Sequence, residues 1–381
     1  MTRAIALLAG EPSGDLLGAG LMRALRERAP DVVFRGIGGE AMEREGLEPL
    51  GSMDRFAING FVEPIRRFGE LLGILQRLER AFAADPPIAF VGIDFNVFNL
   101  LLARRLKRRG IRTLQYVSPS VYAWRRGRIR RIGRAVDAVM TLYPFEPDLY
   151  RTRGVRAVFV GHPMADEIAP VADTGPARAA LGLPHEATVV VLMPGSRRSE
   201  VELMATLMLD AATLLVEELA RPVFVVPCVN PMLRAAMEER LKTRSLKLDV
   251  RLIDGHARDA LAAADGAIVK SGTGTLEAML LRRPMVVTYR LPTVSYHLVK
   301  SLKRSEFVAL PNILAGRLLV PELLQDAARP ESLARALLDE MRRAKAEPGY
   351  FDEFARLHAA LRCGASEQAA QVVLDLVGRR R

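Results

Sequence analysis

The segment from Ser271 to Glu277, Ser-Gly-Thr-Gly-Thr-Leu-Glu, has the residue types of a phosphate-binding loop and lies between a short apolar run and an apolar, helix-like run. Small residues between a strand and a helix leave backbone N–H groups exposed at the positive end of the helix dipole, which suits a phosphate. We therefore predict that Ser271, Gly272 and Thr273 bind phosphate. Glu277, expected in the first helical turn, could accept hydrogen bonds from a ribose. The alternative is a tight turn capped by serine or threonine.

Two more loops of this kind suggest that the chain has two α/β halves. Gly10-Glu11-Pro12-Ser13-Gly14-Asp15 follows the apolar run 5–8, and Pro194-Gly195-Ser196-Arg197 follows the apolar run 189–192. A short, continuous apolar run before such a loop predicts a buried parallel strand. One strand–loop–helix unit near the start and others in the second half favour two α/β domains that face one another.

Composition places the chain among soluble globular enzymes. Its 381 residues suffice for two domains, 50% of them are hydrophobic and 26% are charged. Cys228 and Cys363 are its two cysteines and lie far apart, which argues against a disulfide scaffold or a cysteine metal site and suits a reducing cytoplasm. We recognise no signal peptide and no apolar run of the roughly 20 residues that a membrane-spanning helix needs.

The net charge of +11 favours anionic partners. Basic residues cluster at 104–109, at 125–131 and at Lys300, Lys303 and Arg304. Aromatic residues interleave poorly with these clusters and no RNA or DNA motif is present, so we expect no nucleic-acid partner. A phosphate-bearing substrate or a membrane surface explains the clusters better, and a genome-wide preference for arginine is the alternative.

Strand and helix patterns alternate along the chain, which predicts parallel sheets with crossover helices. The expected strands are 4–8, 32–36, 88–93, 113–117, 138–141, 157–160, 189–192, 223–226, 250–253, 267–269 and 285–288. The predicted fold class is α/β, with two domains that each contain a parallel sheet and that face one another. We predict an N-terminal domain of residues 1–165, completed by C-terminal helices in 348–381, a linker at 166–176 and a C-terminal domain of residues 177–347.

The stretch from Phe56 to Leu75 combines apolar residues with Arg66 and Arg67. A basic amphipathic helix can lie in a membrane interface. Its apolar face can equally pack against the protein core. The sequence leaves both interpretations open.

Several further motifs accompany these loops in a fixed order. The set is Gly10-Glu11-Pro12-Ser13-Gly14-Asp15, Tyr116-Val117-Ser118-Pro119-Ser120-Val121-Tyr122-Ala123-Trp124, Pro144-Phe145-Glu146, Gly161-His162-Pro163, Pro194-Gly195-Ser196-Arg197 and Leu310-Pro311-Asn312-Ile313-Leu314-Ala315-Gly316. With these motifs the chain resembles, over nearly its whole length, the lipid-A-disaccharide synthase family, glycosyltransferases of outer-membrane lipid assembly.

The resemblance implies the glycosyltransferase B fold, in which two doubly wound Rossmann-like domains face a central cleft. The UDP-sugar donor is then expected on the C-terminal domain and the acceptor on the N-terminal domain. The implied donor is UDP-2,3-diacylglucosamine and the implied acceptor is 2,3-diacylglucosamine 1-phosphate. The transfer inverts the anomeric carbon, forms a β-1,6-linked disaccharide and releases UDP, without a tightly bound metal or a cofactor. The implied location is cytoplasmic, peripherally associated with the inner membrane, and a homodimer is left open.

The matched motifs carry the candidate substrate-binding residues Ser13, Ser118, Ser196, Arg197 and Asn312. Without a metal, arginine and backbone amides must stabilise the departing pyrophosphate, and Arg197 can offer several planar donors. Asn312 falls on the family's functional asparagine. The alternatives are a surface position for Arg197 and a helix or turn cap for Asn312.

The chain departs from the family at the catalytic carboxylate. The family pattern Gly-Ile-Asp-Ala-Pro-Asp-Phe-Asn-Leu reads here Gly92-Ile93-Asp94-Phe95-Asn96-Val97-Phe98-Asn99-Leu100, so the catalytic aspartate falls on Val97. A general base contributes about 10²–10⁴-fold to a rate. We predict that Asp94, Glu11 or Asp15 compensates. The alternatives are a transferase with a changed acceptor and a non-catalytic binding protein for UDP-sugar or lipid phosphate.

Two further positions bear on the proposed chemistry, Gln115 and His162. Gln115 stands where the family has a histidine before the Tyr-Val-Ser motif. His162 is either a proton carrier or a hinge residue fixed by hydrogen bonds.

Overall fold

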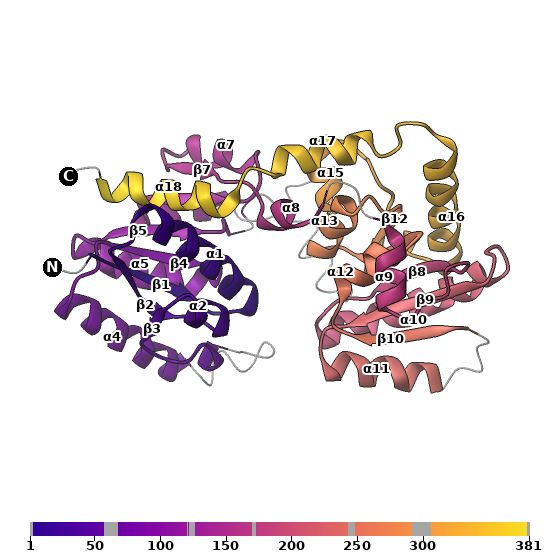
Figure 1. The fold of residues 1–381 in the computed structure, drawn as a ribbon, viewed down its shortest axis with the longest axis horizontal. Helices are drawn as coiled ribbons and strands as arrows, with labels where there is room; N and C mark the ends of the chain where they lie inside the picture. The colour runs from indigo at the N-terminus through magenta and orange to yellow at the C-terminus, as the bar shows by residue number, and fades with distance from the viewer. Residues whose placement is uncertain are drawn as a thin grey trace. The chain divides into compact units, whose positions relative to one another are not determined.

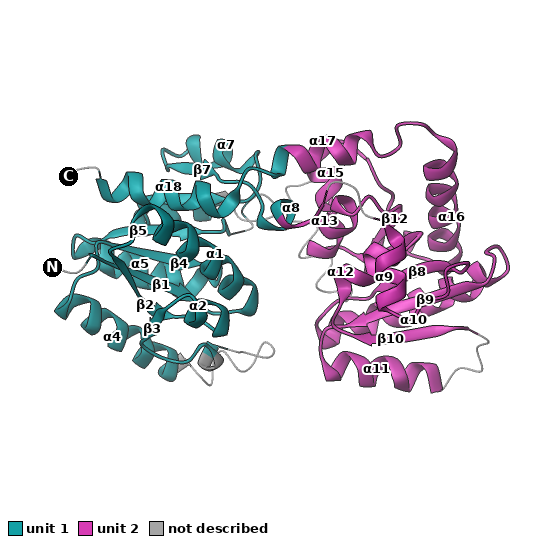
Figure 2. Cartoon of the chain, in the orientation of Figure 1, with its two compact units in different colours: residues 1–166, 360–381 teal, residues 167–359 magenta. Residues whose placement is uncertain are grey.

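The computed structural model describes residues 3–56, 68–119, 121, 126–169, 173–242, 248–291 and 306–378. The chain divides into two compact units, residues 1–166 with 360–381 and residues 167–359 (Figure 2). Each unit contains one parallel sheet with helices packed on it (Figure 1). Residues 57–67 of the amphipathic stretch, Arg125 and the basic group at 300–304 lie outside the described residues.

The first unit has a seven-stranded sheet in the order β3-β2-β1-β4-β5-β6-β7. Its strands are β1 (Arg3–Ala9), β2 (Val32–Ile37), β3 (Leu47–Pro49), β4 (Ala89–Ile93), β5 (Arg112–Tyr116), β6 (Ala138–Thr141) and β7 (Ala157–Phe159). All neighbouring pairs are parallel, with Ile5 of β1 beside Phe34 of β2 and Ala89 of β4. β1 is buried from its second residue onward because helices cover both of its faces.

Alternate residues of β1 enter two cores. Ile5 and Leu7 lie in a cluster with residues of α1, α2 and α18, whereas Ala6 and Leu8 lie with residues of α4, α5 and α6. The helical segments are α1 (Pro12–Arg28), α2 (Glu40–Arg44), η1 (Met53–Phe56), α4 (Phe68–Ala84), α5 (Asn96–Arg108), η2 (Arg126–Arg128), α6 (Ile129–Ala135), α7 (Glu146–Arg151), α8 (Pro163–Glu167) and α18 (Ala365–Gly378). The end of the chain therefore completes the core of its first unit.

The second unit has a six-stranded parallel sheet in the order β10-β9-β8-β11-β12-β13. Its strands are β8 (Thr188–Met193), β9 (Pro222–Cys228), β10 (Val250–Asp254), β11 (Gly266–Lys270), β12 (Met285–Tyr289) and β13 (Glu322–Leu324). The helical segments are α9 (Thr174–Ala180), α10 (Arg198–Val216), α11 (Pro231–Lys242), α12 (Ala257–Ala263), α13 (Thr273–Leu280), α15 (Leu310–Ala315), η3 (Gln325–Ala327), α16 (Pro330–Ala346) and α17 (Asp352–Leu361). Residues of α10, α11 and α16 form one large core with the strands.

The strands predicted from the sequence are all present, and the two that were missed are short. β3 and β13 have three residues each and lie at sheet edges. Three residues are too few for a periodic pattern. The predicted linker is also partly helical, because it contains the end of α8 and the start of α9, where the Asp173 carboxylate accepts from the N–H of Gly175 at 2.9 Å.

The boundary near the C-terminus differs from the sequence-based one. Residues 360–381 belong to the first unit, whereas 348–359 belong to the second. Contacts with α16 tie this segment to the second unit, because the Tyr350 hydroxyl donates to Glu340 at 2.5 Å and the Arg343 guanidinium lies 5.4 Å from the centroid of the Tyr350 ring.

The described part of the amphipathic stretch packs in the core. Ile74 and Leu75 in α4 are buried, together with Leu78 and Phe82 of the same helix. For these residues the core interpretation is confirmed. No helix within the described ranges is long and apolar enough to cross a membrane.

Candidate active site

The predicted loops lie where each sheet reverses its strand order. The reversal falls between β1 and β4 in the first unit and between β8 and β11 in the second. At such a switch point the following helices leave on opposite faces, and the carboxyl ends of the strands leave a crevice in which α/β folds bind ligands. The loops at these points are 10–11 and 94–95 in one unit, and 194–197 and 271–272 in the other.

At the first switch point, Ser13 and Asp94 join the loops after β1 and β4. The Ser13 hydroxyl donates to Oδ2 of Asp94 across 3.3 Å. A Cβ atom added at Gly14 would lie 3.7 Å from the Cβ of Asp94, so the start of α1 approaches this aspartate closely. The fold therefore brings together two of the predicted site residues.

The loop that carries Asp94 has an unusual backbone. Asp94 and Phe95 have positive φ values of 49° and 28°, a conformation that costs a non-glycine residue about 1–3 kcal/mol. The Asp94 carbonyl accepts hydrogen bonds from Nδ2 of Asn99 at 3.2 Å and Nε2 of Gln115 at 2.9 Å. Gln115, which replaces the family's histidine, thus helps to hold this conformation.

The electrostatics of Asp94 suit a proton acceptor. Burial raises the pKa of its carboxyl above the ordinary value, although the Ser13 hydroxyl and the Phe95 N–H oppose this rise. A higher pKa makes the carboxylate a stronger base. The side chain is only half-buried, so a hydroxyl from solvent or substrate can reach it.

Asp15 does not fit the role of general base. Its carboxylate is 7% exposed and accepts hydrogen bonds from the backbone N–H groups of Gly39, Ala41 and Met42 at 2.8–3.0 Å. These bonds cap the start of α2, which is a structural task, and they occupy the oxygens that a base would use. Glu11 is exposed at the N-cap of α1 and stays a candidate.

The position of the family's aspartate is solvent-facing. Val97, in the first turn of α5, is 70% exposed. Beneath it, Phe95 packs against Phe56 and Phe98 with centroid separations of 5.1 and 6.0 Å. A Cβ atom at Gly10 would lie 2.5 Å from the Phe95 ring, so this glycine is needed for the two loops to pack.

Ser118 takes part in a buried polar network rather than an open site. Its Oγ donates to the Pro119 carbonyl at 3.0 Å and lies 2.8 Å from the hydroxyl of Tyr150. It also hydrogen-bonds the Glu146 carboxyl, which is 2% exposed. Burial raises the pKa of Glu146 to about 7, although Ser118 and backbone amides oppose this.

Replacement of Glu146 by Gln is expected to change how stability depends on pH. The pKa of Glu146 is raised in the folded state, so the native protein holds this proton more tightly than the unfolded chain does. The protonated carboxyl therefore contributes its full stabilisation below pH 4.5, and this contribution is lost as the pH rises through 7. Wild type should therefore lose on the order of 3 kcal/mol more than Glu146→Gln across that interval. Urea unfolding at several pH values measures it. Parallel pH profiles for the two proteins would contradict it.

His162 has the surroundings of a structural residue. The ring Nδ1 accepts from the backbone N–H of Met164 at 3.2 Å, and the backbone N–H of His162 donates to the Leu361 carbonyl at 2.9 Å. Burial lowers the pKa of the imidazole to about 4, with Asp166 opposing. A neutral, hydrogen-bonded ring favours the hinge interpretation over the proton carrier.

At the second switch point the glycine-rich loop begins α13. Gly272 is the N-cap and has no side-chain oxygen to cap the helix, while Gly272 and Thr273 are exposed. Ser271 instead donates its hydroxyl to the carbonyl of Val308 at 2.9 Å. The alternative interpretation, a turn capped by serine or threonine, is thus not found at Gly272, and the start of α13 is exposed to solvent at Gly272 and Thr273.

The neighbouring loop after β8 ends with an exposed arginine. Arg197 is 82% exposed in its side chain, and Ser196 is exposed as well. The amides of Ser196 and Arg197 donate to Oε2 of Glu200, at 3.2 and 3.4 Å. The exposed guanidinium lies 3.6 Å from Oε1 of Glu200, whereas the loop backbone is held by hydrogen bonds to Oε2 of the same residue.

Glu277 lies in the second turn of α13, so its expected place in the first turn is wrong: the helix begins at Thr273, earlier than the apolar pattern indicated. Its Oε1 lies 3.4 Å from Nε of Arg258, which also contacts Glu167 at 2.9 Å. Burial raises the pKa of Glu277, and the charge of Arg258 opposes this.

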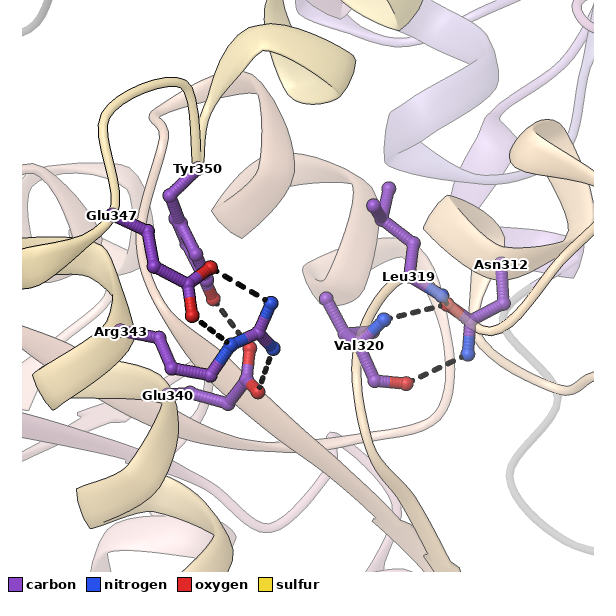
Figure 3. A network of polar contacts seen from close by, with 7 residues as sticks. All are labelled: Asn312, Leu319, Val320, Glu340, Arg343, Glu347 and Tyr350. Carbon is purple, nitrogen blue, oxygen red and sulfur yellow. Dashed lines mark hydrogen bonds and ion pairs between the residues drawn. The ribbon is translucent and has the colours of Figure 1, made fainter.

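Asn312 holds a turn of the chain through hydrogen bonds, which agrees with its alternative, structural interpretation (Figure 3). Its Oδ1 accepts from the amides of Leu319 and Val320, and its Nδ2 donates to the Val320 carbonyl, at 2.7–2.9 Å. Nδ2 also donates to Oε1 of Glu322, which is not drawn in the figure, at 2.9 Å. The residue is fully buried. With both ends of the amide so engaged, the structure gives no support to direct substrate binding by Asn312.

A second polar group in Figure 3 fastens the end of α16. Arg343 donates to Glu340 and to Glu347, and the hydroxyl of Tyr350 donates to Glu340 at 2.5 Å. These contacts fix the turn that leads into α17. They lie away from the predicted site residues in sequence, and no ligand role follows from them.

Three residues that sequence reasoning missed hold the predicted site residues in place. Glu200 follows Arg197 at the spacing of a capping box, which is a recognisable signal. Lys270 is a charged residue at the end of a buried apolar strand. Arg258, which pairs with Glu277, gives no such signal because it comes from a different loop.

Comparison with known families and proteins agrees with this architecture. The family model described as lipid-A-disaccharide synthetase matches residues 5–373. The lipid-A-disaccharide synthase of Pseudomonas savastanoi pv. phaseolicola is 48% identical over 375 residues, which cover 98% of this chain and 97% of that protein. The one from Pseudomonas aeruginosa strain UCBPP-PA14 is 47% identical over 376 residues and covers 99% and 98%.

Solved structures share the fold at low identity. A glycotransferase of kitacinnamycin has a TM-score of 0.66 at 17% identity, covering 99% of this chain and all of that one. The S. aureus MnaA–UDP co-structure has a TM-score of 0.64 at 12% identity, covering 100% and 99%. The fold is therefore that of glycosyltransferase B proteins, as the sequence predicts.

Proposed function

Because this chain belongs to the lipid-A-disaccharide synthetase family, we propose that it joins UDP-2,3-diacylglucosamine to 2,3-diacylglucosamine 1-phosphate. It is a glycosyltransferase of lipid A biosynthesis, with a UDP-sugar donor and a lipid-phosphate acceptor. The family match favours this activity over a changed acceptor or a non-catalytic binding protein.

The observation that supports the chemical step is the contact between Ser13 and Asp94 at the first switch point. In the proposed step, the acceptor hydroxyl attacks the anomeric carbon while Asp94 takes its proton. The bond from that carbon to the UDP oxygen breaks, and the configuration inverts. Asp94 lies three residues before Val97, in the loop after the same strand β4, and it is half-buried with a raised pKa. These properties suit a base that replaces the usual aspartate.

The second unit is proposed to bind the UDP part of the donor. The first amides of α13, behind Gly272, and the exposed guanidinium of Arg197 are suited to a diphosphate. Glu277 is proposed as the ribose partner, oriented by Arg258. The leaving UDP would then be stabilised by protein groups alone.

Replacement of Glu277 or Arg197 by Ala is expected to weaken UDP binding about tenfold or more, because each removes a charged hydrogen-bonding partner. Isothermal titration calorimetry with UDP measures this. Arg198→Ala is the matched control, since Arg198 is the next residue, is 78% exposed and pairs with Glu202 instead. UDP affinity unchanged in both Glu277→Ala and Arg197→Ala would place the nucleotide elsewhere.

A peripheral association with the cytoplasmic face of the inner membrane is also proposed. Part of the basic run 104–109 is neutralised within the protein, because Arg105 and Arg109 pair with Glu79 and Lys107 pairs with Asp137. The exposed Arg130 and Arg131 of α6 are stronger candidates for contact with anionic lipid. The fraction of protein that floats with anionic liposomes should decrease as the salt concentration rises. Flotation that is absent or insensitive to salt would contradict the membrane association.

Sedimentation velocity tests the homodimer that the resemblance leaves open.

A further inference from the structure

Lys270 lies between the two loops of the second switch point. It is the last residue of β11, and its side chain is only 16% exposed. Its Nζ is 2.9 Å from Oε1 of Glu200, across the switch point in α10, and 5.0 Å from the ring centroid of Tyr289. A Cβ atom added at Gly272 would lie 4.0 Å from the same Nζ. The ammonium group therefore sits beside both loops that are proposed to hold the diphosphate.

Glu200, the partner of Lys270, is a carboxylate that holds the loop after β8. Its Oε2 accepts from the amides of Ser196 and Arg197, and its side chain is 11% exposed. Although burial opposes it, the hydrogen bond and charge of Lys270 hold the pKa of Glu200 below its ordinary value. Glu200 is therefore a carboxylate at neutral pH, and it is fixed inside an anion-binding region.

A fixed carboxylate next to a diphosphate is unfavourable by itself. Two like charges a few ångströms apart repel strongly where water is partly excluded. Glu200 cannot simply be absent, because Gly195 has a φ of 118° and its loop is shaped around the Glu200 side chain. A cation paired with Glu200 removes the repulsion and leaves the loop in shape.

We propose that Lys270 is a positioning residue of the donor site, whose ammonium cancels the charge of Glu200 so that the two loops can accept the diphosphate of the UDP-sugar. The proposal rests on the proposed placement of UDP at these loops. Lys270 acts through Glu200, and its effect is confined to ligands that carry phosphate.

The test compares Lys270→Met with Lys270→Arg and with the double variant Lys270→Met/Glu200→Gln. Lys270→Met removes the nearer and more buried of the two cations beside Glu200, and only the exposed Arg197 at 3.6 Å is left to offset its charge. The Kd for UDP should therefore rise about tenfold or more. Lys270→Arg keeps the charge and should stay within a few-fold of wild type. In the double variant both charges are gone while the Gln side chain keeps its length, and the UDP affinity should recover most of the loss.

Uridine lacks phosphate, so its binding distinguishes an effect on the diphosphate from a general loss of structure in the site. Its binding, followed by saturation-transfer NMR, should be the same in wild type and Lys270→Met, with folding checked by urea unfolding. Equal loss for uridine and UDP would overturn the proposal, as would a double variant as weak as Lys270→Met. UDP binding that is unchanged in Lys270→Met but lost in Arg197→Ala would overturn this inference alone, whereas wild type that fails to bind UDP would overturn the proposed donor site.

Discussion

Asp94→Asn is expected to lower kcat by about 10²–10⁴-fold, the usual contribution of a general base. The change keeps the size of the side chain and an oxygen for the Ser13 hydroxyl, so the loop should keep its conformation. It removes only the ability to take a proton. The affinity for UDP should be unchanged, because the proposed UDP groups belong to the other unit. Steady-state turnover with the two diacyl substrates, together with UDP calorimetry, measures both quantities.

Glu11→Gln is the matched control, since Glu11 is an exposed carboxylate at the same switch point. A large loss in Glu11→Gln with an active Asp94→Asn would move the base to Glu11. Asp15→Asn should act on stability instead, because Asp15 caps α2. A wild-type protein without turnover that becomes active as Val97→Asp would show that this chain has given up the chemistry.

Asn312→Ala is expected to destabilise the second unit by about 3 kcal/mol, because it leaves buried groups without hydrogen bonds. The amides of Leu319 and Val320 lose their acceptor, and Glu322 loses a donor. Glu322 also accepts from the amides of Val308 and Ala309, and Val308 receives the Ser271 hydroxyl. We therefore expect weaker UDP binding as a secondary effect. Urea unfolding measures the stability.

Asn230→Ala serves as the comparison for Asn312→Ala. The Asn230 side chain accepts from the amide of Leu233 at 2.8 Å at the start of α11 and is less buried. Loss of such a cap typically costs about 1 kcal/mol. If Asn312→Ala keeps wild-type stability and UDP affinity but loses turnover, Asn312 contacts substrate directly and the structural interpretation is wrong.

The sequence was sufficient for the order of the elements and for the loops that carry the site. Continuous apolar runs such as 189–192 and 267–269 predict strands buried on both faces, and the small residues after them predict strand–helix turns. The resemblance added the fold and the family, which the comparisons confirm. Short edge strands such as β13 carry too few residues to be recognised.

The roles of individual polar side chains depended on the tertiary structure. Asp15, Ser118 and Asn312 all lie in the matched motifs, yet their oxygens are occupied by backbone or buried partners. Glu200 and Lys270 were not singled out, and they form the ion pair between the loops of one switch point. A motif specifies residue types within one segment, whereas a hydrogen-bond partner usually comes from another.

The resemblance of the motifs to a family added the glycosyltransferase activity, whereas the residue pattern by itself determined two parallel α/β sheets with small-residue loops after particular strands. That information is local, because apolar periodicity and turn residues act over a few neighbouring positions. Only the tertiary structure decided that Ser13 meets Asp94 and that Glu200 meets Lys270. Strand order is set by how the helices pack on the sheets, and it is the reversal of that order that places distant loops side by side.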